Sequence, residues 1–568
     1  IADNADYLPT LEYLAGLNAK KHPEVILDLM QERGFTKKIL EYNHRYPACW
    51  RCKTELVWKV ADEWYIKMDE LRPQLIEIVK QINWLPAFGL DRELDWLKNM
   101  HDWLISKKNR YWGLALPIYE CQKCGNFEVI GSKDELKSRA VSGWDKFDGN
   151  SPHKPWIDEV KIKCSKCEET VSRILDVGNP WLDAGIVSFS TMDESWFPAD
   201  FITESFPGQF KNWFYSLIVM GTVLRKTPAF KNVLGFGTLL GEDGRPMHKS
   251  WGNSIEFNEG ADKIGVDVMR WMYATHKPED NMCFGYKIAD ETRRKFYLML
   301  WNIYSFFITY ANLNEWKKVE SKDVLDKWIL ERLYGLISIT TKSLDKYDAF
   351  SASTEIEKFV NDFSTWYIRR SRDRMTDEFF STCYEVLVTL CKLLAPFMPF
   401  VSEEMYRNLT GEESVHLTEW PKSASQELHL QDQMEIVRKI CELGHAQRKL
   451  NNLKVRQPLQ KITIDKDLPD DLLQLIKDEL NVKEVIKGDK IELDTKLTPE
   501  LEAEGKARDL VRDIQDARKL AGTALNEKVI VELPDWPIDF TDYIKAKTLA
   551  KELKKGPVLR VILEPEGR

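Results

Sequence analysis

Apolar residues recur with a helical period through more than a hundred residues in the second half of the chain. The pattern predicts four long amphipathic segments, which begin ETRRKFYLML, LDKWILERLY, ASTEIEKFVN and FSTCYEVLVT. Only short breaks separate these segments, which is typical of a helix bundle. We expect the bundle to end near the sequence EWPKSAS, at residues 419–425.

Upstream of the bundle, short β-rich runs alternate with helical runs. ELVWKV and EWYIKM have the pattern of strands, and DRELDWLKNMHDWLIS has the pattern of a helix. Such alternation indicates an α/β domain. A polar, glycine-containing stretch bounded by cysteine pairs interrupts it and predicts an inserted module. At the two ends, HPEVILDLMQERG predicts a helix, and the last part of the chain mixes helices with the short strands QKITID, KVIVELP and VLRVILEP, typical of a small α+β domain.

Composition adds few constraints. At 568 residues the chain is too long for one core, so we expect three or four domains, and we find no internal repeat in the sequence. A net charge of -9 does not decide whether the protein binds nucleic acid, because a local basic face can still bind a polyanion. The most apolar stretches are too short, or are broken by Lys392 and two prolines, for a membrane-spanning helix of about 20 residues.

Six of the ten cysteines form three Cys-x-x-Cys pairs. The pairs are Cys49 with Cys52, Cys121 with Cys124, and Cys164 with Cys167. The second and third pairs together predict a structural Zn²⁺ site with four thiolate ligands at about 2.3 Å. The 39 residues between them exceed the usual spacing, so reduced thiols without metal are the alternative. The first pair has no evident partner in the sequence. Thiolate ligands favour a reducing compartment, and we expect the cytoplasm.

The stretch GEDGRPMHKSWGN, residues 241–253, follows the apolar run NVLGFGTLL. We expect a strand, a turn and a loop that leads into a helix. Lys249, near the carboxyl edge of a parallel sheet, suits a triphosphate because its ammonium is a compact charge that rotates freely. The alternative is a surface hairpin with a solvated lysine, and on spacing alone the hairpin is the better interpretation.

The order of motifs resembles the isoleucyl-tRNA synthetase family of class I aminoacyl-tRNA synthetases. MHKS followed by WGN is similar to the signature Lys-Met-Ser-Lys-Ser-x-Gly-Asn, HDWLISKKNRYWGLALPIY resembles the family's Arg-Asp-Trp stretch, and NPWLDAG resembles Trp-Phe-Asp-Ser-Gly. FVNDFSTWYIRRSRDR, LLAPFMPFVSEEMY and KVRQPL are similar to its tRNA-binding half. Valyl- and leucyl-tRNA synthetases share the architecture, but WYIRRSR and RYWG together favour the isoleucyl family.

This resemblance implies an α/β fold: the second half of a Rossmann-like catalytic domain with a zinc-ribbon insertion, then an α-helical anticodon-binding bundle and a small α+β domain. The implied ranges are 1–45 for the end of an editing insertion, 46–290 for the catalytic part with its zinc module at 119–175, 291–425 for the bundle and 426–568 for the C-terminal domain. It implies isoleucine, ATP with Mg²⁺, and tRNA(Ile) as substrates and partners, and structural Zn²⁺. We expect a monomer. A non-catalytic RNA-binding protein built from synthetase modules is the main rival interpretation.

The resemblance also implies roles for single residues. Lys249 would stabilise pyrophosphate, and Met247 and Ser250 would shape the same loop. The implied substrate-binding residues are Asp183, Glu204, Gln209, Trp213 and Gly237, the last of these close to adenine. The implied tRNA-binding residues are Arg369, Arg370, Arg372 and Arg374, for which ion pairs inside the bundle are the alternative.

Several positions depart from the family pattern. Pro246 stands where the first signature lysine is expected, and Arg245 could partly substitute for it; the other departures are Gly208, Asn212, Phe236 and His248. None of the nine histidines lies in a His-x-Gly-His motif, and the chain begins IADNADYLPT without an initiator methionine. We therefore expect a fragment without its N-terminal half, in which the zinc partners of Cys49 and Cys52 would lie, and expect that this chain alone cannot form the adenylate.

Overall fold

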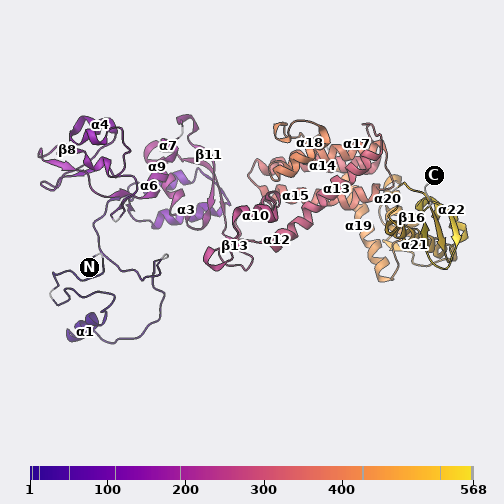
Figure 1. Ribbon diagram of the computed structural model, residues 1–568, viewed down its shortest axis with the longest axis horizontal. Helices are drawn as coiled ribbons and strands as arrows, with labels where there is room; N and C mark the ends of the chain where they lie inside the picture. Colours follow the sequence, from indigo (N-terminus) through magenta and orange to yellow (C-terminus); the bar gives the residue numbers. More distant parts are fainter. Residues whose placement is uncertain are drawn as a thin grey trace. The chain divides into compact units, whose positions relative to one another are not determined.

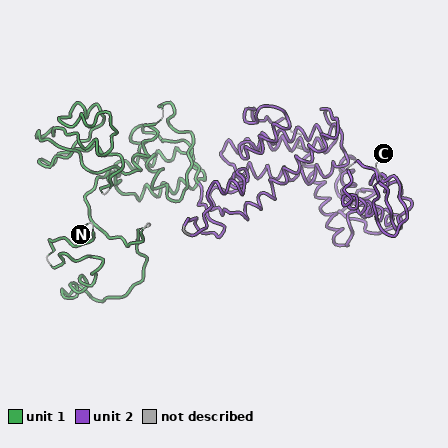
Figure 2. Tube along the Cα trace, in the orientation of Figure 1, with its two compact units in different colours: residues 1–235 green, residues 236–568 purple. Residues whose placement is uncertain are grey.

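The computed structural model describes residues 1–563 except 3, 12, 50, 51, 109, 192, 425–427 and 525, and not the side chains of residues 250 and 428. The chain divides into two compact units, Ile1–Gly235 and Phe236–Arg568 (Figures 1 and 2). Over the described part of the chain, every helix is too short or too polar to cross a bilayer.

Helix α1 (Glu24–Glu32) lies near the start of the chain and confirms the prediction from HPEVILDLMQERG. The strand predicted from ELVWKV is wrong, because Glu55 makes only an isolated bridge with Ala48. Trp58 and Val60 are 83% and 97% exposed, so the apolar side chains of this run lack the packing that stabilises a strand.

A three-stranded sheet forms the centre of the first unit, with strand order β11, β12, β2. Its strands are β2 (Asn83–Leu85), β11 (Ala199–Ser205) and β12 (Phe230–Phe236), and β12 runs parallel to β2. The helices whose side chains form the core with this sheet are α2 (Arg72–Val79), α3 (Phe88–Asn99) and α9 (Trp213–Arg225). A side chain at Gly235 would place its Cβ 1.7 Å from the Phe206 ring, so this close approach requires glycine.

The helix predicted from DRELDWLKNMHDWLIS ends earlier than expected, at Asn99. Arg72 donates hydrogen bonds to the carbonyl oxygens of Leu97 and Met100, which satisfies this helix end. The rest of the run forms β3 (Trp103–Leu104) and β4 (Ser106–Lys107), which pair with β1 (Tyr65–Ile66) and β10 (Val177–Gly178). Local periodicity was overridden here by strand pairing.

Residues 118–172 form a small antiparallel module with its own core. Its main elements are β5 (Ile118–Glu120), β6 (Phe127–Val129), α4 (Lys133–Arg139), β7 (Ala140–Ser142), β8 (Lys161–Lys163) and β9 (Thr170–Ser172). The buried Arg173 binds Asp158 at 2.5 Å and donates to two backbone carbonyl oxygens. These bonds tie the last strand of the module to the segment that leaves it.

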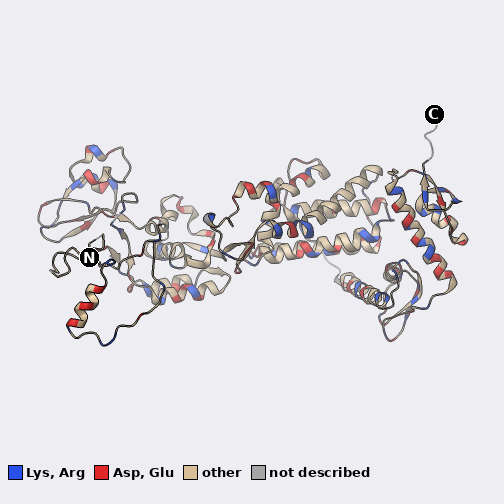
Figure 3. Ribbon diagram, turned by 60° about the horizontal axis from the view of Figure 1, so that its bottom comes forward, with Lys and Arg blue, Asp and Glu red and all other residues tan. Residues whose placement is uncertain are grey.

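The second unit begins with a loop region and continues as a helix bundle. Its elements up to residue 410 are β13 (Leu239–Gly241), η3 (Lys249–Trp251), α10 (Phe257–Ile264), α11 (Val266–Ala274), β14 (Met282–Phe284), α12 (Tyr286–Thr292), η4 (Arg293–Tyr297), α13 (Leu298–Leu313), α14 (Val324–Leu344), α15 (Ala349–Asp362), η5 (Phe363–Ile368), α16 (Arg369–Ser371), α17 (Asp377–Leu394) and α18 (Pro399–Thr410). All four predicted helical segments are helical. The fourth is two helices, because Pro396 and Pro399 cannot continue α17. Basic and acidic residues are interspersed along the bundle (Figure 3).

Residues 428–563 contain the same chain path twice. In each copy a long helix is followed by strand, helix, strand and strand, and the first strand lies between the other two, parallel to the second and antiparallel to the third. The first copy is α19 (Leu428–Leu450), β15 (Leu459–Ile464), α20 (Asp470–Leu480), β16 (Val482–Lys487) and β17 (Glu492–Leu493). The second copy is α21 (Pro499–Leu520), β18 (Val529–Leu533), α22 (Thr541–Thr548), β19 (Ala550–Lys555) and β20 (Arg560–Ile562).

A buried arginine near the end of the long helix marks both copies. Arg448 donates to the carbonyl oxygens six and nine residues further on, at 2.9 and 2.8 Å, and Arg518 does the same at 3.2 and 2.8 Å. The residue after the second helix is left-handed in both, Asn481 at φ 48° and Leu549 at φ 54°. The repeat lies in the fold and could not be found in the sequence, because the two copies share little beyond Arg-Lys-Leu at the helix end.

Candidate functional site

All three Cys-x-x-Cys pairs adopt the same tight turn. The first cysteine's N–H donates to the carbonyl oxygen five residues later, and its own carbonyl accepts from the N–H four residues later; this holds for Cys49, Cys121 and Cys164. The residue that donates this second bond has positive φ in each turn, between 60° and 69°. At Cys121 with Cys124 and at Cys164 with Cys167, the two sulfurs of each pair lie close together, which is the arrangement that a metal needs.

Two of the turns face each other in the antiparallel module. The Sγ atoms of Cys121 and Cys167 are 3.5 Å apart, those of Cys124 and Cys164 are 3.7 Å apart, and all four lie within 4.8 Å of one another. Sulfurs bound at about 2.3 Å at the corners of a tetrahedron have this separation, so the donor set fits Zn²⁺. Backbone N–H groups of the turn lower the pKa of Cys164 to about 6, whereas burial and hydrogen bonds with the neighbouring sulfurs raise the pKa of Cys167 to about 12.

The third turn, at Cys49 and Cys52, is not part of a four-ligand group among the described residues. Hydrogen bonds from Thr54, first from its side chain and then from its backbone, lower the pKa of Cys52 to about 7. The backbone hydrogen bonds at this pair are the same as those at the two pairs that supply the four-cysteine group.

The loop at 241–253 is a hairpin followed by a single helical turn. Leu240 bridges Pro246, and Asn253 closes the loop by donating to the Pro246 carbonyl oxygen at 3.1 Å and accepting from the His248 N–H at 2.9 Å. Lys249 begins η3, is exposed, and has no ion-pair partner in the described part of the chain. The loop thus presents Lys249 to solvent from a closed frame.

The two other residues predicted for this loop, and Gly237 before it, are placed differently. Met247 packs against the small core of α10, α11 and α12, whereas the side chain of Ser250 lies outside the described atoms. A Cβ at Gly237 would lie 2.5 Å from the Asp280 carbonyl oxygen, so the fold itself requires glycine there. Steric packing against Asp280 therefore accounts for Gly237 without a nucleotide.

The residues predicted to bind the amino acid lie in the first unit. Glu204 is near the end of β11 and accepts a hydrogen bond from the Ser205 N–H at 2.8 Å. Gln209 accepts from the N–H of Trp213 at 3.3 Å, so it caps the start of α9, and the Trp213 indole is half-buried beside Phe214. These residues therefore occupy the end of one strand and the start of the next long helix.

Asp183 lies on α6 (Pro180–Gly185) and is exposed. The Asn179 side chain caps this helix, and Gly185 allows a close approach to α9, where a Cβ would meet the Ser216 carbonyl oxygen at 2.7 Å. Asp183 is thereby held on α6, which packs against α9, and Trp213 is the first residue of α9.

Three of the four arginines predicted to bind tRNA make ion pairs inside the second unit. Arg369 and Arg370 reach the carboxylate of Glu479 at 2.7 and 3.0 Å, and Arg374 binds the buried Asp326 at 2.6 and 2.7 Å. These contacts correspond to the structural alternative for the three side chains. They join the bundle to the first C-terminal copy and fix the end of η5.

Arg372 differs from these three. Its side chain is exposed, and it has no ion-pair partner in the part of the chain that the structure describes. Of the four arginines, it keeps its charge available to a ligand.

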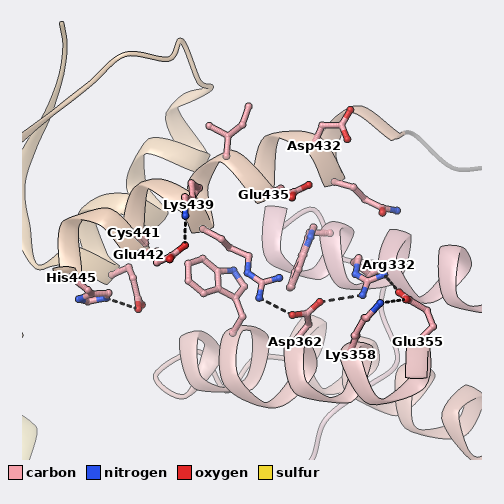
Figure 4. Close-up of a pocket in the computed structure, with 16 residues that line it drawn as sticks. Arg332, Glu355, Lys358, Asp362, Asp432, Glu435, Lys439, Cys441, Glu442 and His445 are labelled. Carbon is pink, nitrogen blue, oxygen red and sulfur yellow. Dashed lines mark hydrogen bonds and ion pairs between the residues drawn. The ribbon is translucent and has the colours of Figure 1, made fainter. Parts of the chain in front are cut away.

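An open pocket of about 1130 Å³ lies between α14, α15 and α19 (Figure 4). Asp362 joins two of its walls by binding Arg332 at 3.1 Å and Arg438 at 2.7 Å. Glu355 pairs with both Arg332 and Lys358. Most positive charges of the pocket are thus neutralised by neighbouring carboxylates, which makes it a poor anion site. The pairs of Asp362 with Arg332 and Arg438 join segments far apart in the chain, so no local sequence pattern could have indicated them, whereas Glu355 and Lys358 are three residues apart on α15.

Glu93 on α3 is a buried carboxylate that was not predicted from the sequence as a candidate site residue. It is fully buried, neither carboxylate oxygen has a hydrogen-bond partner among the described residues, and burial raises its pKa well above the ordinary value. The Tyr215 hydroxyl and the Trp96 Nε1, whose rings are 5.8 Å apart, also lack described partners. A signal was available, since Glu93 falls between Leu90 and Leu97 on the apolar face of the helix.

Comparison with known proteins gives two family matches. The tRNA synthetases class I (I, L, M and V) match residues 19–283, and the anticodon-binding domain of tRNA ligase matches residues 326–464. The second match includes the bundle helices from α14 onward and α19 of the first C-terminal copy.

Curated relatives named isoleucine–tRNA ligase align with most of the chain. The protein from Clostridium tetani (strain Massachusetts / E88) is 36% identical over 536 residues, which cover 88% of this chain and 51% of the relative. That from Dehalococcoides mccartyi (strain ATCC BAA-2266 / KCTC 15142 / 195) is 35% identical, covering 95% and 60%, and that from Clostridium novyi (strain NT) is 38% identical, covering 87% and 50%. The chain thus spans about half the length of the curated relatives it matches. The loop at 241–253 and the paired cysteine turns lie in the first family match, and the bundle helices from α14 onward lie in the second. The chain therefore contains a class I tRNA synthetase domain of the I, L, M and V group and an anticodon-binding domain of tRNA ligases.

Proposed function

We propose that this chain is part of an isoleucine–tRNA ligase, which activates isoleucine with ATP and transfers it to tRNA(Ile). The observation that carries the proposal is the alignment of 87–95% of the chain with curated isoleucine–tRNA ligases at 35–38% identity. Within it, residues 46–290 would supply the second half of the catalytic domain, residues 291–425 the anticodon-binding bundle, and residues 1–45 the end of an editing insertion.

In the first step a carboxylate oxygen of isoleucine attacks the α-phosphorus of ATP. The new O–P bond forms as the bond to the bridging oxygen breaks, and pyrophosphate leaves with the electron pair. Negative charge grows on the leaving group, and Lys249 is placed on an exposed turn from which its ammonium could neutralise part of it. Mg²⁺ bound to the phosphates would supply further positive charge. In the second step a ribose hydroxyl of the tRNA loses its proton and attacks the acyl carbon; the new C–O bond forms as the bond from the acyl carbon to the phosphate oxygen breaks, and AMP leaves with the electron pair.

For the amino acid, we propose contacts from the first unit. The Glu204 carboxylate would pair with the substrate ammonium, and the Trp213 indole would form an apolar wall for the side chain. Gln209 would hold Trp213 in place through the bond to its N–H, and Asp183 is a further candidate for the polar end of the substrate. For tRNA, the exposed Arg372 is the best candidate among the four arginines, because the other three are already paired.

We also propose structural Zn²⁺ on Cys121, Cys124, Cys164 and Cys167, supported by the mutual distances of their sulfurs. Cys49 and Cys52 would form half of a second site, supported by their identical turn. Metal analysis of the purified 568-residue chain should find about one zinc per chain. Replacing Cys121 and Cys164 by serine should remove it, whereas replacing Cys283, which stands outside the pairs, should not. Zinc-free protein with native circular dichroism would contradict the proposal.

The function is tested by isoleucine-dependent exchange of pyrophosphate into ATP, measured on the complete polypeptide encoded by the gene, with valine and leucine as competitors. Isoleucine should support exchange at least about 100-fold better than either, given the discrimination that an apolar pocket achieves against a missing methylene. Preference for valine or leucine would assign a sister enzyme. Binding of tRNA without any exchange would favour a non-catalytic RNA-binding protein. The 568-residue chain by itself should be inactive in exchange.

A further inference from the structure

The turn that precedes Lys249 holds a second cation in a defined position. The Asp243 carboxylate accepts hydrogen bonds from two groups of Arg245, the backbone N–H at 3.0 Å and the side-chain Nε at 2.8 Å. The Nη2 atom of Arg245 also lies 2.6 Å from this carboxylate. The Gly241 N–H donates to the Arg245 carbonyl oxygen at 2.9 Å and closes the hairpin. The guanidinium is thus folded back onto its own turn.

This arrangement is easily exchanged for another anion. The side chains of Arg245 and Asp243 are 66% and 35% exposed, and exposed ion pairs contribute only about 0–1 kcal/mol. A guanidinium presents parallel N–H groups that match a phosphate as well as they match a carboxylate. A nucleoside triphosphate could therefore take Arg245 from Asp243 at little cost.

The loop has few other positive charges. Between residues 241 and 253 the sequence contains only Arg245 and Lys249 as permanently charged cations. Pro246, beside Arg245, can neither carry charge nor donate a backbone hydrogen bond. A triphosphate bound by this loop meets two cations, four residues apart, on the two sides of Pro246 and Met247.

We propose that Arg245 is a catalytic residue: its guanidinium leaves Asp243 and binds the leaving pyrophosphate, and with Lys249 it supplies the loop's positive charge. Asp243 holds the guanidinium in the resting state and releases it to the phosphates. This inference rests on the proposed function, because it needs ATP as the substrate of the loop.

The test uses the complete gene product and isoleucine-dependent pyrophosphate exchange. Arg245→Gln should lower kcat about 10- to 100-fold, with the KM for isoleucine unchanged, because one charged contact to the leaving group is lost. Lys249→Ala should cause a loss of similar size. The double variant Arg245→Gln/Pro246→Lys should recover activity to within a few-fold, since it restores a cation to the adjacent position.

Arg225→Gln is the matched control, because Arg225 also forms an exposed ion pair, with Glu194, but lies outside the loop; it should leave kcat unchanged. Exchange by Arg245→Gln within three-fold of the parent, while Lys249→Ala is impaired, would overturn the proposal. So would the absence of rescue by lysine at position 246 in a variant of native stability.

Calorimetric binding of Mg-ATP separates this proposal from the proposed function. If the parent shows no exchange with isoleucine, the function fails, but Arg245→Gln should still weaken Mg-ATP binding at least about five-fold relative to Arg225→Gln. Equal binding by these two variants would refute the role of Arg245 whatever amino acid the enzyme activates.

Discussion

The two copies in the C-terminal part of the chain have one topology but different attachments to the rest of the molecule. In the first copy, Glu479 is 7% exposed and binds Arg369, Arg370 and His445. The equivalent position in the second copy, two residues before the left-handed residue, is Lys547. Its side chain is half exposed, and its Nζ lies 3.5 Å from a carboxylate oxygen of the exposed Asp373. Among the described residues, a buried carboxylate thus anchors the first copy to the bundle, whereas the second copy is joined to it by an exposed ion pair.

The interiors of the copies also solve the same packing problem in opposite ways. In the first copy, Gly444 on the long helix meets the large Leu480 on the second helix; in the second copy the equivalent residues are Ile514 and the small Thr548, all of them buried. The large and small members have changed places. One chain path can therefore be kept although the side chains at equivalent positions of the two helices differ in size.

The largest effect is expected at the buried arginine of the first copy. Arg448 is 1% exposed and donates five hydrogen bonds to carbonyl oxygens, and no carboxylate in the described part of the chain pairs with it. Arg448→Met would leave these buried acceptors unsatisfied and should cost about 3–5 kcal/mol in local stability. Hydrogen exchange of residues 428–497, followed by mass spectrometry, measures this loss without assuming that the whole chain unfolds in one step.

The second copy supplies the comparison for this change. Arg518 is 4% exposed, donates to only two carbonyl oxygens, and its Nη1 has no described partner, so Arg518→Met should cost less, about 1–3 kcal/mol. Lys449→Met and Lys519→Met, at exposed neighbouring positions, are the controls. An equal loss in both copies would contradict the prediction, because it would mean that the loss does not depend on how many hydrogen bonds each arginine donates.

A smaller effect is expected from the exchanged helix contact. A Cβ on Gly444 would lie 2.5 Å from the Leu480 side chain, so Gly444→Ile should overpack the first copy and cost about 2–3 kcal/mol. Adding Leu480→Thr imports the arrangement of the second copy and should recover at least half of that loss. Hydrogen exchange of the two helices is the measurement. Additive losses in the double variant would mean that the two copies are not equivalent at this contact.

The next effect concerns the anchor of the first copy and depends on pH. Burial by itself would raise the pKa of Glu479, but hydrogen bonds from His445 and Arg369 and the nearby arginine charges lower it to about 2. The folded pKa lies below the ordinary value, so the stabilisation is present above about pH 4.3 and is lost as pH falls toward 2. Glu479→Gln should therefore cost about 2 kcal/mol at pH 7 and less than about 1 kcal/mol near pH 2.5, with the remainder lost as the pH falls through 2.

The smallest effect is expected at the matching position of the second copy. Lys547→Gln removes an ion pair whose side chains are 50% and 91% exposed, and should change stability by less than about 0.5 kcal/mol at any pH. The same acid titration, read by hydrogen exchange, serves both variants. A pH-dependent loss in Lys547→Gln as large as that in Glu479→Gln would remove the contrast between a buried and a surface anchor.

Local patterns predicted much of the fold where one helix face is apolar over a long distance. All four bundle segments were recognised from their period, because burial of a continuous apolar stripe dominates there. The prediction failed for ELVWKV, whose apolar side chains are exposed, and for the second half of DRELDWLKNMHDWLIS, where pairing of β3 and β4 replaced the helix. The period of a short run cannot reveal whether a partner strand exists.

For the candidate site, the sequence indicated the residue types, and the tertiary structure decided which residues they contact. The cysteine spacing predicted the turns, but only the fold brought Cys121 to 3.5 Å from Cys167. The run of arginines in WYIRRSRDR suggested phosphate binding, and the fold paired three of them with acids, one of these on α20 more than a hundred residues away. Likewise the sequence places Arg245 next to Pro246, but only the folded turn brings its guanidinium to Asp243.

The sequence by itself determined the family, the positions of the helices in the bundle and the chemistry available on the loop at 241–253, because these depend on residue type and short-range spacing. Tertiary structure alone decided which charges are neutralised, which cysteines meet, and that residues 428–563 repeat one fold. The physical reason is the same in each case: ion pairs, metal sites and volume complementarity join residues far apart in the chain, and their partners can change together while the backbone path stays constant.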